Sequence, residues 1–287
     1  IYGDPCSSLV YKGTLESASK FGISIEQFDH RQASKRFPLF QADEKLHAVF
    51  EPEAGFLHVE KCVSAYSNLA QKYGAMIREQ ENVKDYSAHD TGVTVQTDKG
   101  IYSADRLVIT GGAWNVRLLN DIGVALKLKR LIQYWIKVPA NYDIKRRVPC
   151  FAFHTADDFY YGFPMLDGKT IKIASHFSGH NIQSPSEKKM NEIPLVELQF
   201  IQNFVRSHLI GVTGELDRFS TCIYTMTPDE HFVIDQHPKN NRVTFAAGFS
   251  GHGFKFASVI GEILADLSLT GTTKHPIDFL RLRKFNP

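Results

Sequence analysis

A run of glycines set directly before a helix-period pattern is the feature that most limits how this chain can fold. The stretch AAGFSGHGFKFASVIGEILADL, residues 246–267, contains Gly248, Gly251 and Gly253. Apolar residues then follow on one helical face, namely Phe256, Ile260, Ile263, Leu264 and Leu267. Because glycine has no Cβ, the backbone can approach a ligand closely there, and the helix start aims unpaired N–H groups above the turn. Lys255 lies in the first turn, where the helix dipole disfavours a cation, which indicates a function for its charge. The alternative is a turn that only caps an amphipathic helix.

Two common phosphate-binding motifs are excluded at this turn. A Walker phosphate loop requires Gly-Lys-Ser/Thr in direct succession, but Phe254 separates Gly253 from Lys255. A dinucleotide fingerprint requires G-x-G-x-x-G after a strand that opens a βαβ unit, and these glycines have another spacing near the C-terminus. Neither kind of nucleotide loop is therefore expected here.

Length and composition fit an ordinary globular protein. The 287 residues allow one large or two medium domains, and 43% of them are hydrophobic. A net charge of +2 gives no sign of a nucleic-acid or membrane partner, and no apolar run approaches the roughly 18 residues of a transmembrane helix. The first residues lack a signal-peptide pattern, and the cysteines form no C-x-x-C pair. We therefore expect a cytoplasmic protein without zinc or disulfides.

Helix and strand patterns alternate along the first half of the chain. Residues 60–73 have helical periodicity and end at Gly74, and 75–79 look like a short strand. Three strands, VTVQT, IYSA and RLVIT, predict a meander over 93–110. The last of these strands leads directly into Gly111-Gly112 and a helix start. In α/β proteins this arrangement lets a ligand approach the backbone closely, but it is also typical of a plain tight turn.

From Leu131 onward the segments become short, aromatic and β-branched, which predicts a largely antiparallel sheet. Residues 191–209 have a helical pattern, and strand patterns follow before the final helix. The chain is thus expected to be an α/β (α+β) protein built from two interleaved modules.

Several long stretches resemble the monomeric sarcosine oxidase / N-methyltryptophan oxidase family, the FAD-dependent amine oxidases of the D-amino-acid oxidase group. They are ADRLVITGGAWNVRLL, DFYYGFP, TIKIASHF, CIYTMTPDEHFVIDQHP and the glycine–helix stretch itself. The resemblance implies an FAD-binding module at 61–125 and 228–287, interleaved with a substrate domain at 1–60 and 126–227. Family members begin with a βαβ unit that carries the fingerprint for the ADP half of FAD. This sequence has none, so we expect an N-terminally truncated module.

The resemblance also implies a reaction. It is the oxidation of the C–N bond of a secondary, N-methyl amino acid by FAD, with O2 reduced to hydrogen peroxide in a monomeric enzyme. Two alternatives stay open at this point. The chain could be a truncated, non-catalytic fragment that binds no FAD on its own, or a related dehydrogenase or deaminase of the same fold.

The resemblance assigns catalytic residues by position. Cys222 stands where the family attaches FAD through a thioether, although a free cysteine is often only a small buried hydrophobe. Lys172 matches a lysine over the flavin that promotes the reaction with O2, but the alternation of Ile171 and Ile173 around it also fits the solvent face of a strand. His176 and Tyr224 match residues near the substrate amine, or are satisfied core residues.

The remaining site residues are assigned in the same way. Lys255 matches the partner of the substrate carboxylate, and Tyr161 matches a substrate-side tyrosine. Ala152 stands where sarcosine-specific relatives carry a larger side chain, which leaves room for a bigger substrate. The expected cofactor-site residues besides Cys222 are Gly111, Gly112, Trp114, Gly248, Gly251, His252, Gly253 and Phe254. The other histidines have no metal-ligand spacing, so no metal is expected.

Overall fold

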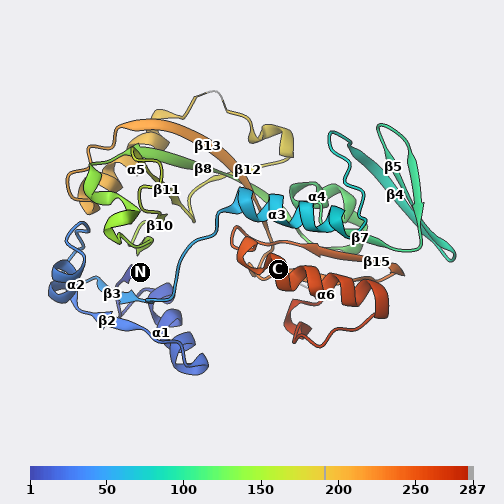
Figure 1. Ribbon diagram of the computed structural model, residues 1–287, viewed down its shortest axis with the longest axis horizontal. Helices are drawn as coiled ribbons and strands as arrows, with labels where there is room; N and C mark the ends of the chain where they lie inside the picture. Colours follow the sequence, from blue (N-terminus) through green and yellow to red (C-terminus); the bar gives the residue numbers. More distant parts are fainter. Residues whose placement is uncertain (191, 284–287) are drawn as a thin grey trace. The chain divides into compact units, whose positions relative to one another are not determined.

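The structure is a computed structural model that describes residues 1–190 and 192–283 (Figure 1). The chain divides into two compact units, each made of three separate segments. Unit 1 consists of Ile1–Phe56, Arg130–His180 and Lys188–Cys222, and unit 2 consists of Leu57–Lys129, Asn181–Glu187 and Ile223–Pro287. Within the described residues, no helix is both long and apolar enough to cross a membrane.

Most of unit 1 is organised on a nine-stranded sheet. Its order is β12-β8-β11-β10-β9-β1-β3-β2, and β13 also pairs with β8. The strands are β1 Tyr2–Gly3, β2 Glu26–Phe28, β3 His47–Phe50, β8 Lys127–Lys137, β9 Phe151–His154, β10 Phe159–Gly162, β11 Thr170–Ser175, β12 His180–Ile182 and β13 Leu216–Met226. The helices of unit 1 are α1 Leu9–Phe21, α2 His30–Arg36 and α5 Leu195–His208. Two helices, α1 and α2, have side-chain N-caps, Ser8 and Asp29.

Alternation along the central strands separates a core face from an outer face. On β11, Ile171 and Ile173 are fully buried in the core of unit 1. The core continues to α5, where Phe204 stacks on Tyr160 of β10 with the ring centroids 3.9 Å apart. Because successive strand residues point to opposite faces, Lys172 lies on the other face of the sheet. The predicted antiparallel block is present. The helix predicted over 191–209 is present as α5, Leu195–His208, and residue 191 lies outside the described residues.

Unit 2 holds two three-stranded sheets, ordered β14-β15-β7 and β4-β5-β6. Their strands are β4 Val83–His89, β5 Gly92–Thr97, β6 Ile101–Ala104, β7 Leu107–Ile109, β14 Val233–His237 and β15 Asn240–Ala247. The helices are α3 Val59–Lys72, α4 Asn115–Leu118 and α6 Ala257–Thr270. Short 3-10 helices also occur in the chain, namely η1 Gly112–Trp114, η2 Asn120–Ile122, η3 Ala140–Tyr142, η4 Ile144–Arg146, η5 Pro185–Lys188, η6 Phe254–Phe256 and η7 Asp278–Leu280.

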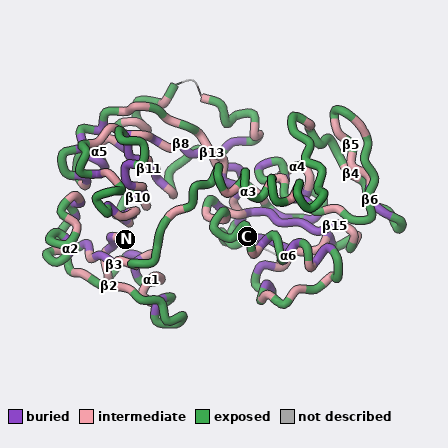
Figure 2. The backbone as a smooth tube through the Cα atoms, viewed as in Figure 1, coloured by how far each residue is buried: buried purple, intermediate pink, exposed green. Residues whose placement is uncertain are grey.

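Helix α6 packs through the predicted apolar face. Ile260, Ile263, Leu264 and Leu267 are all buried in one cluster with residues of β14 and β15. Figure 2 shows buried stretches in purple along α6 and β15. The fifth predicted position, Phe256, is 40% exposed because it precedes the helix in η6.

Two strand predictions in this region are wrong. RLVIT does not complete a meander, because β7 pairs in parallel with β15, Leu107 opposite Val243. The antiparallel meander in this region is formed by β4, β5 and β6, without β7. Residues 75–79 form no strand, and the strand that pairs with β5 begins at Val83 instead. The predicted helix over 60–73 is present as α3, which has no buried residue among its described positions.

Candidate functional site

The outer face of the sheet in unit 1 gathers four of the predicted site residues. Tyr161 on β10 lies opposite Ala152 on β9 and opposite Ala174 on β11. Paired residues of adjacent strands point to the same side, and so do residues two apart on one strand. Lys172 therefore shares this face with Tyr161 and Ala152. His176 directly follows β11, and its ring centroid lies 6.5 Å from that of Tyr161.

Aromatic rings surround the ammonium group of Lys172. Its Nζ lies 5.4 Å from the ring centroid of Trp135, the residue opposite it on β8, and 5.7 Å from that of Phe163. Both distances are within the range of cation–π attraction. Lys172 alternates with buried Ile171 and Ile173, as expected for a lysine on the outer face. On that face its ammonium group lies near the rings of Trp135 and Phe163.

Cys222 on β13 is a half-buried thiol in the same unit. Burial raises its pKa, while the positive charges of Lys172 and Lys188 act in the opposite direction and lower it. The net direction is upward, so burial outweighs the two cations, which offset only part of its effect on this sulfur. No disulfide joins the four cysteines, all of which lie in the described part of the chain.

The glycine turn of unit 2 is fixed by the protein's own side chains. A Cβ on Gly251 would lie 2.2 Å from the ring of Tyr224, and one on Gly253 would lie 2.4 Å from Phe249. Gly248 has φ of +68° and its Cβ would lie 2.3 Å from Thr227. Ser250 also has a positive φ of 46°. Positions 248, 251 and 253 therefore require glycine for internal packing, whether or not a ligand is present.

A cavity of about 550 Å³ lies beside this turn within unit 2. Its walls come from the ends of β7 and β15, from β13 and from α6, and they are largely apolar. Six predicted residues line it: Gly112, Tyr224, Gly248, Gly251, Gly253 and Phe254. A planar aromatic ring system fits such walls, with backbone N–H and C=O groups at the turns to orient it.

Asn115 joins the two glycine turns, and the sequence did not single it out. It is fully buried, its Oδ1 accepts a hydrogen bond from Gly111 N at 3.0 Å, and its Nδ2 donates to Ala246 O at 3.0 Å. A Cβ on Gly111 would lie 2.6 Å from that same Oδ1. Asn115 thus connects the turn after β7 to the end of β15, directly before the second glycine turn. The only signal in the sequence was its position directly after GGAW.

Lys255 and His252 line a different cavity of unit 2, of about 380 Å³. Phe232, Phe256 and Phe279 also line it. Burial lowers the pKa of His252. The side chain of Trp114 is 56% exposed. Lys255 therefore lines a different cavity from its neighbours Gly253 and Phe254. Its role beside the substrate carboxylate stays a prediction.

The predicted residues are divided between the units. Unit 1 contains Ala152, Tyr161, Lys172, His176 and Cys222, and unit 2 contains the glycine turns, Trp114, Tyr224, His252 and Lys255. Among residues 1–190 and 192–283, no cluster of three or more His, Cys, Asp or Glu side chains could hold a metal ion.

Comparison with known proteins defines the class of this chain. The model of the family described as FAD dependent oxidoreductase matches residues 10–267, and the chain belongs to that family. Monomeric sarcosine oxidase of Bacillus sp. (strain NS-129) is 36% identical, over 99% of this chain and 74% of that protein. N-methyl-L-tryptophan oxidase of Salmonella typhi is 31% identical, over 98% of this chain and 75% of that protein.

Solved structures agree on the fold. The open form of NikD, an unusual amino acid oxidase essential for nikkomycin biosynthesis, has a TM-score of 0.79 at 22% identity and covers 94% of this chain and 71% of that one. Glycine oxidase from Geobacillus kaustophilus has a TM-score of 0.78 at 17% identity, over 98% of this chain and 73% of that one. The expected fold class and family are thus confirmed. The chain is an FAD-dependent oxidoreductase of the sarcosine oxidase / N-methyltryptophan oxidase type.

Proposed function

We propose that the protein oxidises the C–N bond of a secondary, N-methyl amino acid and that O2 is reduced to hydrogen peroxide. The observation that carries this proposal is the shared outer face of Ala152, Tyr161 and Lys172 in a member of an FAD-dependent family. Relatives named for sarcosine and for N-methyl-L-tryptophan support the substrate class. FAD, when bound, takes up the hydride equivalent from the carbon beside nitrogen and passes the electrons to O2.

The cofactor residues of the proposal are those that the resemblance implies. The segments 61–125 and 228–287 form the FAD-binding domain of the proposal, and 1–60 and 126–227 form the substrate domain. The apolar cavity of about 550 Å³ beside the glycine turn fits a flat ring system. Cys222 supplies the thiol for a thioether, and the charges of Lys172 and Lys188 offset part of the rise in its pKa that burial causes. His252 and Trp114 belong to the cofactor residues of the proposal.

Substrate binding needs a cation and neutral polar groups. In the proposal, the ammonium group of Lys255 pairs with the substrate carboxylate. His176 and Tyr224 hydrogen-bond the amine in its neutral form, because the amine must lose its proton before oxidation. Tyr161 contacts the substrate, and the small side chain of Ala152 leaves room for a substrate larger than sarcosine.

Lys172 is proposed to stabilise the negative charge that develops when O2 takes up electrons. Replacing a preorganised charge of this kind slows the assisted step by about 100-fold. We therefore expect Lys172→Met to slow reoxidation of the reduced protein by that factor while substrate reduction of the flavin continues. Lys137→Met is the matched control, since Lys137 lies on the neighbouring strand β8 opposite Thr170. Stopped-flow measurement of flavin reduction and of reoxidation by O2 tests this expectation. An unchanged rate of reoxidation in Lys172→Met would refute the role of Lys172.

FAD binding separates the proposal from its alternatives. A purified protein whose yellow colour survives acid precipitation supports covalent FAD at Cys222, and intact mass confirms the adduct. A colourless protein that takes up no added FAD would show that this chain alone is a non-catalytic fragment. Peroxide release with a panel of N-methyl amino acids distinguishes an oxidase from a dehydrogenase of the same fold.

The proposal includes a monomer in the reducing cytoplasm. The four free thiols support the reducing compartment. The name of the Bacillus relative, monomeric sarcosine oxidase, supports the monomer. Light scattering of the purified protein tests the monomer, and a stable dimer would contradict it.

A further inference from the structure

Two cations lie over one indole ring on the outer face of the unit 1 sheet. The guanidinium carbon of Arg218 is 4.8 Å from the ring centroid of Trp135, and Nζ of Lys172 is 5.4 Å from the same centroid. Tryptophan is the best partner for cation–π attraction, and both distances lie within its range of about 6 Å. Since like charges repel, two cations at one ring require something to hold them there.

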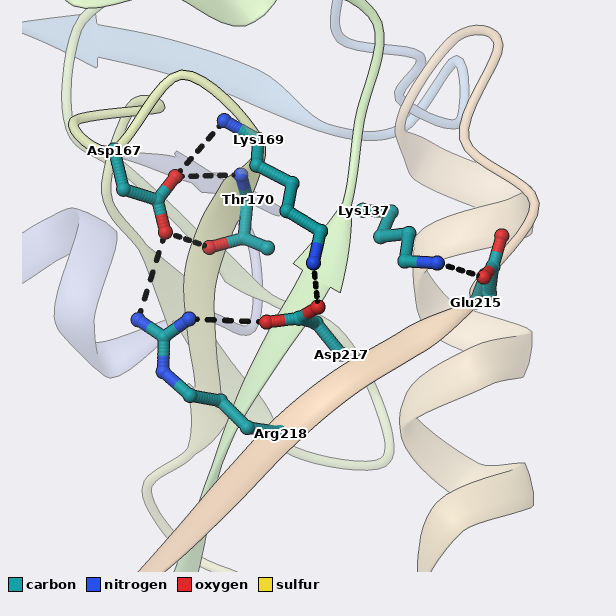
Figure 3. A network of polar contacts seen from close by, with 7 residues as sticks. All are labelled: Lys137, Asp167, Lys169, Thr170, Glu215, Asp217 and Arg218. Atoms are coloured by element: carbon teal, nitrogen blue, oxygen red, sulfur yellow. Dashed lines mark hydrogen bonds and ion pairs between the residues drawn. The ribbon is translucent and has the colours of Figure 1, made fainter.

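A network of carboxylates holds Arg218 (Figure 3). Its Nη1 lies 3.1 Å from Asp217 Oδ2, and its Nη2 lies 3.5 Å from Asp167 Oδ2. Asp217 also pairs with the ammonium group of Lys169. The guanidinium group is thus oriented from two sides, one of them its own strand β13 and the other the turn before β11.

Asp167 is itself fixed by the start of β11. It accepts hydrogen bonds from Thr170 N at 2.7 Å, from Thr170 Oγ1 at 2.6 Å and from Lys169 N at 3.0 Å. Burial alone would raise the pKa of Asp167, but these hydrogen bonds and the charge of Arg218 lower it to about 2. Asp167 is therefore a carboxylate throughout the neutral range, and it ties Arg218 to the strand that carries Lys172.

We propose that Trp135 is a positioning residue that holds the ammonium group of Lys172 on the outer face of the sheet, and that Arg218 holds the indole in place. A carboxylate would orient an ammonium group but would also neutralise its charge. An aromatic ring carries no net charge, so it can orient the ammonium group without neutralising it. The ring of Trp135 therefore orients Lys172 without cancelling the charge that the oxygen step uses. This inference rests on the proposed role of Lys172, and its experiment separates the two.

The first test measures the half-reactions of the FAD-bound protein. We expect Trp135→Leu to slow reoxidation by O2 about 2- to 30-fold, the factor that corresponds to one lost cation–π contact, and to change flavin reduction by less than about 2-fold. Trp135→Phe keeps a weaker ring and is expected to lie between wild type and Trp135→Leu. Arg218→Met should slow the same step by a smaller factor. Arg218 is half exposed, so this variant folds even if a Trp135 variant does not.

The second test needs no flavin. The charge of Lys172 lowers the pKa of the Cys222 thiol, so displacing the ammonium group raises it. In protein without FAD and with Cys6, Cys62 and Cys150 replaced by serine, we follow iodoacetamide alkylation against pH. Trp135→Leu is expected to move the midpoint in the same direction as Lys172→Met, whereas the control Lys137→Met leaves it in place.

The outcomes distinguish the inference from the proposed function. If Lys172→Met slows reoxidation but the Trp135 and Arg218 variants do not, and the alkylation midpoint stays fixed, the positioning role is refuted. If Lys172→Met leaves reoxidation unchanged, the oxygen role is refuted, and a moved midpoint in Trp135→Leu still supports positioning by Trp135. Equal slowing of both half-reactions in Trp135→Leu indicates general distortion and also refutes the inference.

Discussion

Asp158 is the buried carboxylate on which the turn after β11 depends. It is 2% exposed, and its Oδ2 accepts hydrogen bonds from Ser175 Oγ at 2.6 Å and from Ser178 N at 3.0 Å. Its Oδ1 accepts from Phe159 N at 2.6 Å and from Phe177 N at 3.0 Å. A short contact with the hydroxyl of Ser178 completes the set. One carboxylate therefore closes the turn that contains His176.

Asp158→Ala should destabilise the protein by about 3–5 kcal/mol. Each buried donor left without a partner costs about 1–3 kcal/mol. The hydroxyl of Ser175 is buried, and the amide of Phe159 is partly buried. The amides of Phe177 and Ser178 lie in an exposed turn, where water replaces the lost carboxylate at a smaller cost. Asp158→Asn keeps the shape and one acceptor oxygen, so a smaller loss is expected.

Urea unfolding at neutral pH, followed by circular dichroism, measures both variants. Asp157→Ala is the matched control, because Asp157 is the adjacent carboxylate in sequence but is exposed, and it should change the free energy of unfolding by less than about 0.5 kcal/mol. A loss below about 1 kcal/mol in Asp158→Ala would show that water satisfies all the stranded donors, and the reasoning from burial would then be refuted.

Two further predictions concern unit 2. Gly251→Ala places a Cβ 2.2 Å from the ring of Tyr224 at a φ of +83°, so we expect a loss of about 2–4 kcal/mol in urea unfolding. Gly261→Ala is its control, because nothing lies within 4 Å of the new Cβ in the middle of α6, and it should stabilise by up to about 1 kcal/mol; equal effects would contradict the steric argument. The hydrogen bonds from Arg283 lower the pKa of Asp229 to about 2, so the stability that this pair contributes is present above about pH 4 and is lost as pH falls towards 2. Asp229→Asn should flatten thermal stability across that range, and an unchanged pH profile would show that the pair contributes nothing.

Local sequence patterns predicted which segments form helices and strands better than they predicted which strands pair. The face of α6 could be read from the spacing of its apolar residues, and four of the five positions are buried. RLVIT was correctly identified as a strand but assigned to the wrong sheet, because a short turn favours a hairpin with the preceding strand. Its actual partner, β15, lies more than a hundred residues further along the chain, and no local signal marks a parallel pair of that kind.

The glycine turn is another place where contacts from distant parts of the chain could not be predicted from the local sequence. The sequence explained Gly248, Gly251 and Gly253 by the close approach of a ligand, since only neighbours in sequence were visible. In the structure, the atoms that exclude a Cβ from Gly248 and Gly251 belong to Thr227 and Tyr224, which come from the end of β13. Packing inside the protein therefore accounts for glycine at these positions, and the cavity lies beside the turn that they form.

Lys172 illustrates what a strand register adds to a pattern. Alternation with Ile171 and Ile173 fixed the face on which Lys172 lies, but that face could as well have been bare to solvent. The register of β11 against β8 sets Trp135 opposite Lys172. A shift by one residue would place Tyr134 or Ile136, both buried in the core, on that face instead. The register that buries Ile136 and Ile171 is therefore the one that gives Lys172 its aromatic partner, so core packing and the position of this charge are set by the same pairing.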